Sequence, residues 1–294
     1  MKKVIFKGAA TALATPFTND GINYDEFRKL IEFQISNEID ALVVCGTTGE
    51  SACMTLQEKK DAIKFVVDTV NHRVPVIAGT VSNCTKNAIE LSKYAENVGA
   101  DGLLIVTPYY NKTSKKGLIA HYTEIAKNTN LPIILYNVPS RTGMNITPDV
   151  CLELSKLQNI VGIKEASGNI SQIAEIANIC KDNLAIYSGN DDQIVPILSL
   201  GGFGVISVLS NIAPKYTHDI VYNYLNNNSN LACKMQLDAI PLIKTLFIET
   251  NPIPVKYSLN LMGYDFGKPR LPLVELSDEY KNKLKDEMEK LKIL

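Results

Sequence analysis

The sequence contains a short apolar run, Ile160-Val161-Gly162-Ile163-Lys164-Glu165-Ala166, with a lysine near its end. Its length and its β-branched residues are typical of a strand that is buried on both faces. Amphipathic stretches with helical spacing separate this run from others like it, often behind a Ser, Thr or Asp that suits a helix N-cap. Seven similar runs occur along the chain, at residues 10–15, 41–45, 75–79, 102–106, 132–137, 185–188 and 204–208.

Eight strand–helix units favour a closed (β/α)8 barrel, a TIM barrel of the α/β class, because an open doubly wound sheet usually has fewer strands and a Gly-rich phosphate turn. We expect this catalytic barrel over residues 1–227. Helical patterns near 231–248, 255–262 and 277–291 predict a C-terminal helical domain over residues 228–294. The polar stretch at 226–230 suggests the boundary, although it fits a loop within one continuous helical layer equally well.

The charge of the chain is nearly balanced, with 30 basic and 31 acidic residues, so a nucleic acid is not an expected partner. The first residues lack the apolar stretch of a signal peptide, and no run reaches the roughly 18 apolar residues that a membrane span needs. We therefore expect a cytoplasmic protein without a membrane partner. At 46% hydrophobic residues, the chain has enough apolar side chains for a substantial core.

The cysteines and histidines show no spacing that is typical of a metal site or a redox motif. We expect no metal, and we expect most cysteines to be reduced residues of the core. The residues concerned are Cys45, Cys53, Cys84, Cys151, Cys180 and Cys233, together with His72, His121 and His218.

Lys164 lies at the carboxyl end of its predicted strand, where the reactive groups of such barrels gather. Burial disfavours the charged form of a lysine, and a neutral amine attacks ketones to form a Schiff base. The alternative is a lysine that extends its ammonium to water. Because other polar groups also follow strand ends, the covalent interpretation is favoured.

A Schiff-base enzyme also needs a proton relay and a pocket for the substrate carboxylate. Tyr136 ends the preceding strand and would exchange protons beside Lys164, while Thr47 and Tyr110 offer hydroxyls that pass a proton outward. The loop at 46–51 combines glycines, hydroxyls and a helix N-terminus, which suits a carboxylate. A packed tyrosine ring and an ordinary capped turn are the alternatives for these features.

Arg141 lies in a Pro- and Gly-containing loop, residues 137–143, that follows the strand ending at Tyr136. Its planar guanidinium is suited to binding a second carboxylate through two hydrogen bonds. An exposed loop arginine without a ligand is the alternative.

The chain resembles the dihydrodipicolinate synthase family, within the class I pyruvate aldolase and N-acetylneuraminate lyase superfamily, from one end to the other. The resemblance implies a lyase that condenses pyruvate with L-aspartate 4-semialdehyde, the first committed step of the diaminopimelate and lysine pathway. It implies no cofactor beyond a covalent pyruvate imine on the enzyme. The matching stretches are Ala12–Phe17, Gly46–Ser51, Val106–Lys112, Tyr136–Gly143, Gly162–Ala166 and Asn251–Lys256.

The resemblance also implies roles for the catalytic residues. Lys164 would form the imine, and Tyr136 would donate and accept protons beside it. Thr47 would connect Tyr136 to Tyr110, which in this family reaches in from the neighbouring subunit. The family usually forms a dimer of dimers, so we expect a homotetramer by analogy.

The substrate-binding roles follow in the same way from the resemblance. Thr48 would hold the carboxylate of pyruvate, and Arg141 would hold the carboxylate of the semialdehyde. The backbone near Gly189 and Ile206 would shape the surroundings of the lysine. Arg141 also favours the synthases over the sialic acid lyases, which typically carry a different loop at this point.

Regulation by lysine is expected to be weak or absent. Lysine-inhibited members of the family bind lysine through two histidines and a glutamate, whereas the corresponding positions here are Leu56, Lys59 and Asn87. Lys59 would repel the ammonium of the ligand. Two other functions are also considered: a pyruvate-dependent aldolase that acts on a sugar acid, and a non-catalytic protein that binds sugars or anions.

Overall fold

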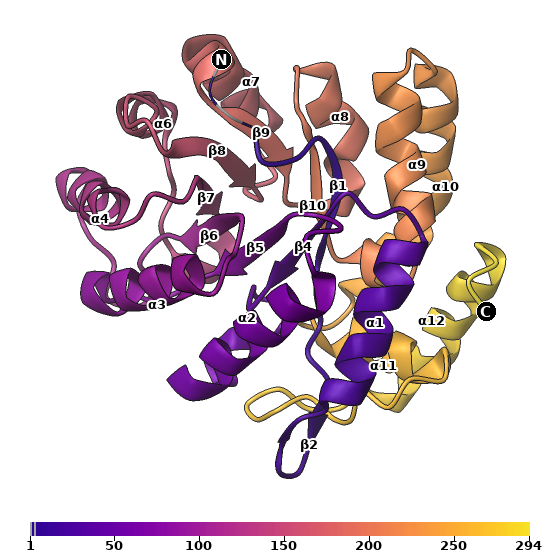
Figure 1. Ribbon diagram of the computed structural model, residues 1–294. Coiled ribbons are helices and arrows are strands. Elements are labelled where there is room, and N and C mark those ends of the chain that lie inside the picture. The colour runs from indigo at the N-terminus through magenta and orange to yellow at the C-terminus, as the bar shows by residue number, and fades with distance from the viewer. Residues whose placement is uncertain (1, 3) are drawn as a thin grey trace.

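Eight parallel strands close into a barrel in the computed structural model, which describes residue 2 and residues 4–294 (Figure 1). The strand order is β1, β10, β9, β8, β7, β6, β5 and β4, and β4 closes the ring on β1. The strands are β1 Gly8–Ala12, β4 Ala41–Val44, β5 Val76–Gly79, β6 Gly102–Val106, β7 Ile133–Asn137, β8 Ile160–Glu165, β9 Ala185–Ser188 and β10 Gly204–Ser207. The predicted barrel is confirmed.

The first strand differs from its prediction, because it ends at Ala12 rather than at residue 15. The backbone N–H of Ala14 donates to the side chain of Asn211 over 2.9 Å, which takes the chain out of the strand ladder. A small hairpin then follows, with β2 at Phe17–Thr18 and β3 at Gly21–Ile22.

Helices surround the barrel and cover the outer face of its strands (Figure 1). Local capping starts several of them: in α2, for example, Thr55 and Glu58 each bond the other's backbone N–H, which is a capping box. The helices of the barrel are α1 Tyr24–Ser36, α2 Leu56–Val70, α3 Thr85–Asn97, α4 Lys115–Lys127, α5 Pro139–Thr142, α6 Pro148–Leu154, α7 Ile170–Cys180, α8 Ile194–Ser199 and α9 Pro214–Leu225.

Three helices follow α9: α10 Ser229–Leu246, α11 Ile253–Leu261 and α12 Asp278–Lys290. They agree closely with the three helices expected from the sequence. α10 packs along α9 and against α12 (Figure 1), and α11 packs against α10, α12 and the short turn at Leu209–Asn211 that follows β10. The division into domains at residue 227 stays a prediction.

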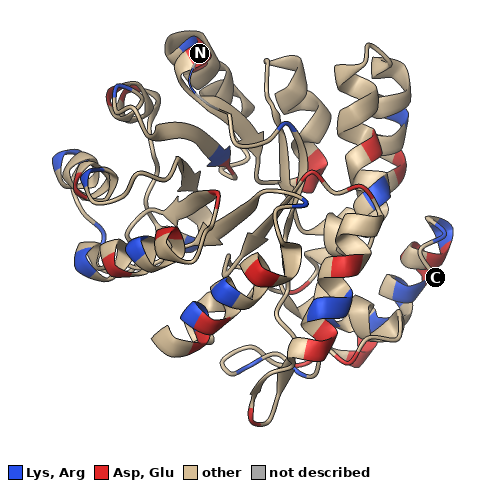
Figure 2. Cartoon of the chain, in the orientation of Figure 1, with Lys and Arg blue, Asp and Glu red and all other residues tan. Residues whose placement is uncertain are grey.

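The core has two parts, one inside the barrel and one between the strands and the helices. Inside, Phe6 stacks on Tyr187 with ring centroids 4.4 Å apart, and it fills the end of the barrel at which the strands begin. The carboxyl ends of the strands are therefore the open end. Charged residues lie mainly on the outer helices (Figure 2).

The six cysteines are all free, but only Cys45, Cys151 and Cys180 are buried. Cys53 is half-buried, whereas Cys84 and Cys233 are exposed. The expectation of core cysteines therefore holds for half of them, because Cys84 and Cys233 lie on outward-facing parts of the helical layer. Within the described residues, no helix has both the length and the apolar character that spanning a bilayer requires.

Candidate active site

Tyr136 and Lys164 lie side by side at the carboxyl ends of β7 and β8. They are direct partners in the register of these two strands, so both side chains point to the same side of the sheet. The Lys164 Nζ atom lies 4.4 Å from the centroid of the Tyr136 ring. Lys164 is only 5% exposed and Tyr136 only 6%. The structure therefore brings the amine and the phenol together, and their catalytic roles stay a prediction.

A cavity of about 200 Å³ opens in front of this pair. It is smaller than the roughly 300–1,000 Å³ that is usual for drug-sized ligands, and so suits a small organic acid. Six of the residues predicted from the sequence line it: Thr47, Thr48, Tyr136, Arg141, Lys164 and Gly189. The other lining residues are Val138, Ser140, Ala166, Asn190, Val208, Phe247 and Asn251.

The loop after β4 brings Thr47 and Thr48 to the cavity. Thr15 holds this loop, since its hydroxyl donates to the carbonyl of Gly49 over 2.9 Å. The hydroxyl of Thr48 accepts a hydrogen bond from the side-chain amide of Asn251 over 3.0 Å. A hydroxyl has one donor and two acceptor sites, so the hydrogen of Thr48 remains free to donate to a ligand.

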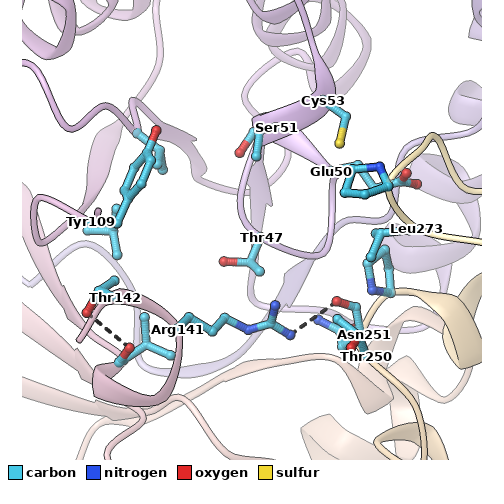
Figure 3. Close-up of a pocket in the computed structure, with 16 residues that line it drawn as sticks. Thr47, Glu50, Ser51, Cys53, Tyr109, Arg141, Thr142, Thr250, Asn251 and Leu273 are labelled. Carbon is cyan, nitrogen blue, oxygen red and sulfur yellow. Dashed lines mark hydrogen bonds between the residues drawn. The ribbon is translucent and has the colours of Figure 1, made fainter. Parts of the chain in front are cut away.

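Arg141 lies on the short helix α5, which ends at Gly143 in the left-handed conformation with φ at 67°. Its guanidinium donates to the backbone carbonyl of Asn251 over 3.1 Å (Figure 3). This bond uses one of the five N–H groups, which leaves others to bind an anion. Arg141 is exposed, so it lies at the mouth of the site rather than inside it.

A second cavity of about 340 Å³ adjoins the first, and Figure 3 shows it lined by Thr47, Tyr109 and Arg141. The two cavities share Thr47, Val138, Arg141 and Asn251. Arg141 therefore lies where an outer chamber meets the inner one that holds Lys164. The arrangement provides a deep place for one small acid and an outer place for a second.

Gly189 follows β9 and brings backbone close to the lysine strand. Its N–H donates to the carbonyl of Glu165 over 2.7 Å. A Cβ atom at this position would lie 2.6 Å from the Cβ of Ala166, which is too close for any side chain. The glycine is therefore required for the two strand ends to approach each other.

Two predicted residues do not line the cavity. Tyr110 is 91% exposed, has a positive φ of 70°, and lines neither this cavity nor the outer one of its own chain. Ile206 is fully buried within the barrel and pairs with Ala10 in the strand register. Val208, two residues later, lines the cavity instead, because Ile206 lies one layer deeper on the same side of its strand.

Sequence reasoning gave no role to Asn251, which lies two residues before the start of α11 and is 5% exposed. Its amide reaches Thr48 and its carbonyl reaches Arg141, while its Oδ1 atom is buried without a partner among the described residues. Asn251 belongs to one of the stretches that resemble the family, at residues 251–256. Its place in a turn of the form Asn-Pro-x-Pro was the available signal.

The loop that carries the threonines is also held by a buried ion pair between Glu50 and Lys256. The Lys256 Nζ lies 2.8 Å from Glu50 Oε1, and the side chains are 1% and 0% exposed, respectively. The second carboxylate oxygen accepts from the backbone N–H of Arg270 over 2.8 Å. Burial lowers the pKa of Lys256, and the charge of Glu50 opposes that effect.

Another buried carboxylate, Asp191, follows β9. Its Oδ2 atom accepts from the backbone N–H groups of Val208 and Leu209 over 3.0 and 2.9 Å. Burial raises the pKa of Asp191, although these hydrogen bonds and the charge of Lys164 act in the opposite direction. These bonds fix the chain that carries Val208 into the cavity.

The described residues include no group of three or more His, Cys, Asp or Glu side chains that is placed to hold a metal ion. The chemistry of the site is that of an amine, a phenol, hydroxyls and a guanidinium. These groups suit proton transfer and the binding of carboxylates.

A model of the Dihydrodipicolinate synthetase family matches residues 5–291, which include the whole barrel and the helices after it. The chain belongs to this family. Membership confirms the resemblance seen in the motifs, and it makes the protein a lyase of the dihydrodipicolinate synthetase family.

Individual members of the dihydrodipicolinate synthetase family match along almost their full length. The chain is 56% identical over 284 residues to 4-hydroxy-tetrahydrodipicolinate synthase 1 of Clostridium acetobutylicum, with 97% of each chain covered. It is 61% identical over 274 residues to the 4-hydroxy-tetrahydrodipicolinate synthase of Clostridium perfringens strain SM101, covering 93% of this chain and 94% of that one. The dihydrodipicolinate synthase of Thermotoga maritima superposes with a TM-score of 0.97 at 40% identity, covering 99% and 100% of the two chains.

Proposed function

We propose that the chain acts as a 4-hydroxy-tetrahydrodipicolinate synthase, in which Lys164 forms an imine with pyruvate and the resulting enamine attacks L-aspartate 4-semialdehyde. The observation that carries this proposal is the pairing of Lys164 and Tyr136 at the bottom of a small cavity. Family membership supports the reaction class, and the residue roles below are part of the proposal.

In the first step, the amine of Lys164 attacks the keto carbon of pyruvate and gives a carbinolamine. Tyr136 donates a proton to the leaving hydroxyl, so that water departs and an iminium forms. Loss of a proton from the methyl group then gives the enamine. The aromatic ring beside Nζ favours the cationic iminium, because the face of the ring is electron-rich.

In the second step, the enamine carbon attacks the aldehyde carbon of the semialdehyde and a carbon–carbon bond forms. The aldehyde oxygen takes up a proton and becomes the 4-hydroxyl. The amino group of the adduct then attacks the iminium carbon and closes the ring. Lys164 leaves as a free amine, ready for another cycle.

Binding of the two acids follows from the lining of the chambers. The free hydrogen of the Thr48 hydroxyl would donate to the carboxylate of pyruvate in the inner cavity. Arg141 at the mouth would bind the carboxylate of the semialdehyde through charge-assisted hydrogen bonds. The unpartnered Oδ1 of Asn251 would accept a hydrogen bond from the ammonium group of the semialdehyde.

Thr47 and Tyr110 would carry the proton between Tyr136 and solvent, with Tyr110 entering from a second copy of the chain. The 91% exposure of Tyr110 supports this arrangement, because the ring is free to contact a second copy of the chain. A mixture of the Lys164→Ala and Tyr110→Ala variants tests it. Mixed dimers would contain one complete site and regain activity, whereas a Tyr110 that acts within its own chain would give no regain.

The wider expectations belong to the same proposal: a homotetramer built from two dimers, a cytoplasmic location, and no cofactor other than the imine on Lys164. Lys59 is half-buried, and burial lowers its pKa. Its ammonium would still oppose a bound lysine, so inhibition by lysine is expected to require more than a millimolar concentration.

Turnover with alternative acceptors tests the proposed substrate. Purified protein with pyruvate should consume L-aspartate 4-semialdehyde and yield a cyclic product that is detected by mass spectrometry. N-acetylmannosamine and short aldoses with pyruvate are the matched comparison. Turnover of these sugars in place of the semialdehyde would show instead an aldolase for sugar acids.

A further inference from the structure

A buried carboxylate lies directly behind the reactive pair, and the mechanism above does not use it. Glu165 follows Lys164 on β8, and Asn137 follows Tyr136 on β7. The two are partners in the strand register, one step beyond the Tyr136–Lys164 pair, and both are 0% exposed. Successive residues of a strand point to opposite faces, so Glu165 and Asn137 lie on the outer face of the barrel.

Every group that contacts the Glu165 carboxylate is a neutral hydrogen-bond donor. The amide of Asn137 lies 3.2 and 3.0 Å from its two oxygens, and the backbone N–H of Ser167 donates over 2.7 Å. The amide of Gln172 on α7 donates over 3.2 Å. Within the described part of the chain, no cation forms an ion pair with this carboxylate. A group that only accepts is required here, because a glutamine would turn its own N–H₂ toward donors.

The same network holds both ends of the segment that carries Arg141. Asn137, before the segment, accepts from the backbone N–H of Ile146 over 2.9 Å and donates to Asn145 over 2.8 Å. Asn145, after the segment, donates to Gln172 over 2.7 Å, and Gln172 bonds Glu165. The carboxylate therefore lies at the centre of bonds that fix three chain segments.

We infer that Glu165 is a positioning residue for the reaction: it sets the spacing of Lys164, Tyr136 and Arg141 through Asn137 and Gln172. Lys164 and Tyr136 each lie one residue from a member of the network, and Arg141 lies in the segment that the network holds at Asn137 and Asn145. A displacement of the reacting groups by about 1 Å can cost about a hundredfold in rate, so the network has a catalytic effect without touching the substrate. The inference rests on the proposed role of Lys164.

The test compares Glu165→Gln, Asn137→Asp and the double variant that carries both. We expect each single change to lower kcat by between about ten- and a hundredfold and to slow borohydride trapping of pyruvate, with a smaller change in the pyruvate KM. The double variant exchanges the carboxylate and the amide across the two strands. It should recover part of the lost rate, because the amide introduced on β8 can donate to the carboxylate introduced on β7 while its oxygen still accepts from the backbone N–H of Ser167.

Glu175→Gln, an exposed change on α7, is the matched control and should keep the parental rate. If Glu165→Gln does not fold, Gln172→Ala provides a milder change. It removes one of the hydrogen bonds to the Glu165 carboxylate and should lower kcat by a smaller factor. A folded Glu165→Gln variant with parental kcat and trapping rate would refute the inference, as would a double variant no faster than the singles. Failure of the parent protein to be trapped on Lys164 would instead refute the proposed function.

Discussion

The side-chain amide of Asn251 donates to the hydroxyl of Thr48 over 3.0 Å, although 203 residues separate them. This bond orients the hydroxyl that is proposed to hold the pyruvate carboxylate. It also makes the chain beyond α10 part of the active site. The loop after β4 and the turn before α11 thus form one binding surface.

Asn251→Ala should raise the KM for pyruvate by about tenfold, because a hydrogen bond of this kind contributes about 0.5–1.5 kcal/mol and Thr48 would lose its orientation. The change in kcat should be smaller. Steady-state kinetics with varied pyruvate measures both constants. Asn230→Ala, an exposed change on α10, is the control. An unchanged KM in the Asn251 variant would separate this residue from pyruvate binding.

Tyr136→Phe keeps the ring beside Lys164 but removes the hydroxyl that exchanges protons. We expect kcat to fall by about 10²- to 10⁴-fold, which is the usual contribution of a general acid or base. Single-turnover experiments with pyruvate should show slower imine formation. Tyr222→Phe, at an exposed position, should leave the rate intact. Parental imine formation in the Tyr136 variant would assign the proton transfer to another group.

The buried pair of Glu50 and Lys256 predicts a pattern in stability. Lys256→Met alone leaves a buried carboxylate without its cation and should lower the free energy of unfolding by about 3–5 kcal/mol. The double variant Glu50→Gln with Lys256→Met removes both charges and should recover most of this loss. Urea unfolding measures each change. Equal losses that simply add in the double variant would contradict the coupling of the two residues.

His218 predicts a pH dependence of stability at the other end of the barrel. Its Nδ1 bonds the Asp40 carboxylate over 2.8 Å, and this bond raises the pKa of His218 above the ordinary 6.5. A raised pKa means that the stabilisation is complete below pH 6.5 and is lost as the pH rises through the folded-state value.

His218→Asn should therefore lower the free energy of unfolding more at about pH 5.5 than at about pH 9. His121 acts in the opposite sense, because burial lowers its pKa to about 4 and its charging opposes folding as the pH falls from 6.5 toward that value. A His121→Gln background separates the two contributions. A His218 variant whose effect grew with pH would show that the bond to Asp40 does not form in solution.

The sequence predicted the barrel because each strand is a local apolar run, and local runs are visible without a structure. Lys164 and Tyr136 were also predictable, since both end such runs and neighbouring strands of a parallel barrel bring their ends together. Thr47, Thr48 and Arg141 were found for the same reason. Thr47 and Thr48 lie in the loop that follows β4, and Arg141 lies on α5, the short helix that follows β7.

The unpredicted parts depend on contacts between distant segments. Asn251 reaches Thr48 across 203 residues and Gln172 reaches Asn145 across 27, and neither pairing leaves a pattern in the local sequence. Val208 lines the cavity whereas Ile206 does not, and the sequence does not say which of two residues that share a face reaches the end of the strand. The role expected for the backbone near Ile206 stays a prediction.

Borohydride reduction with pyruvate, followed by peptide mass mapping, tests the central claim most directly. The account predicts that a reduced pyruvate adduct appears on the peptide that contains Lys164, and that the Lys164→Arg variant gains no adduct and loses turnover. An adduct on a different lysine, or a Lys164→Arg variant that keeps the parental turnover, would contradict it.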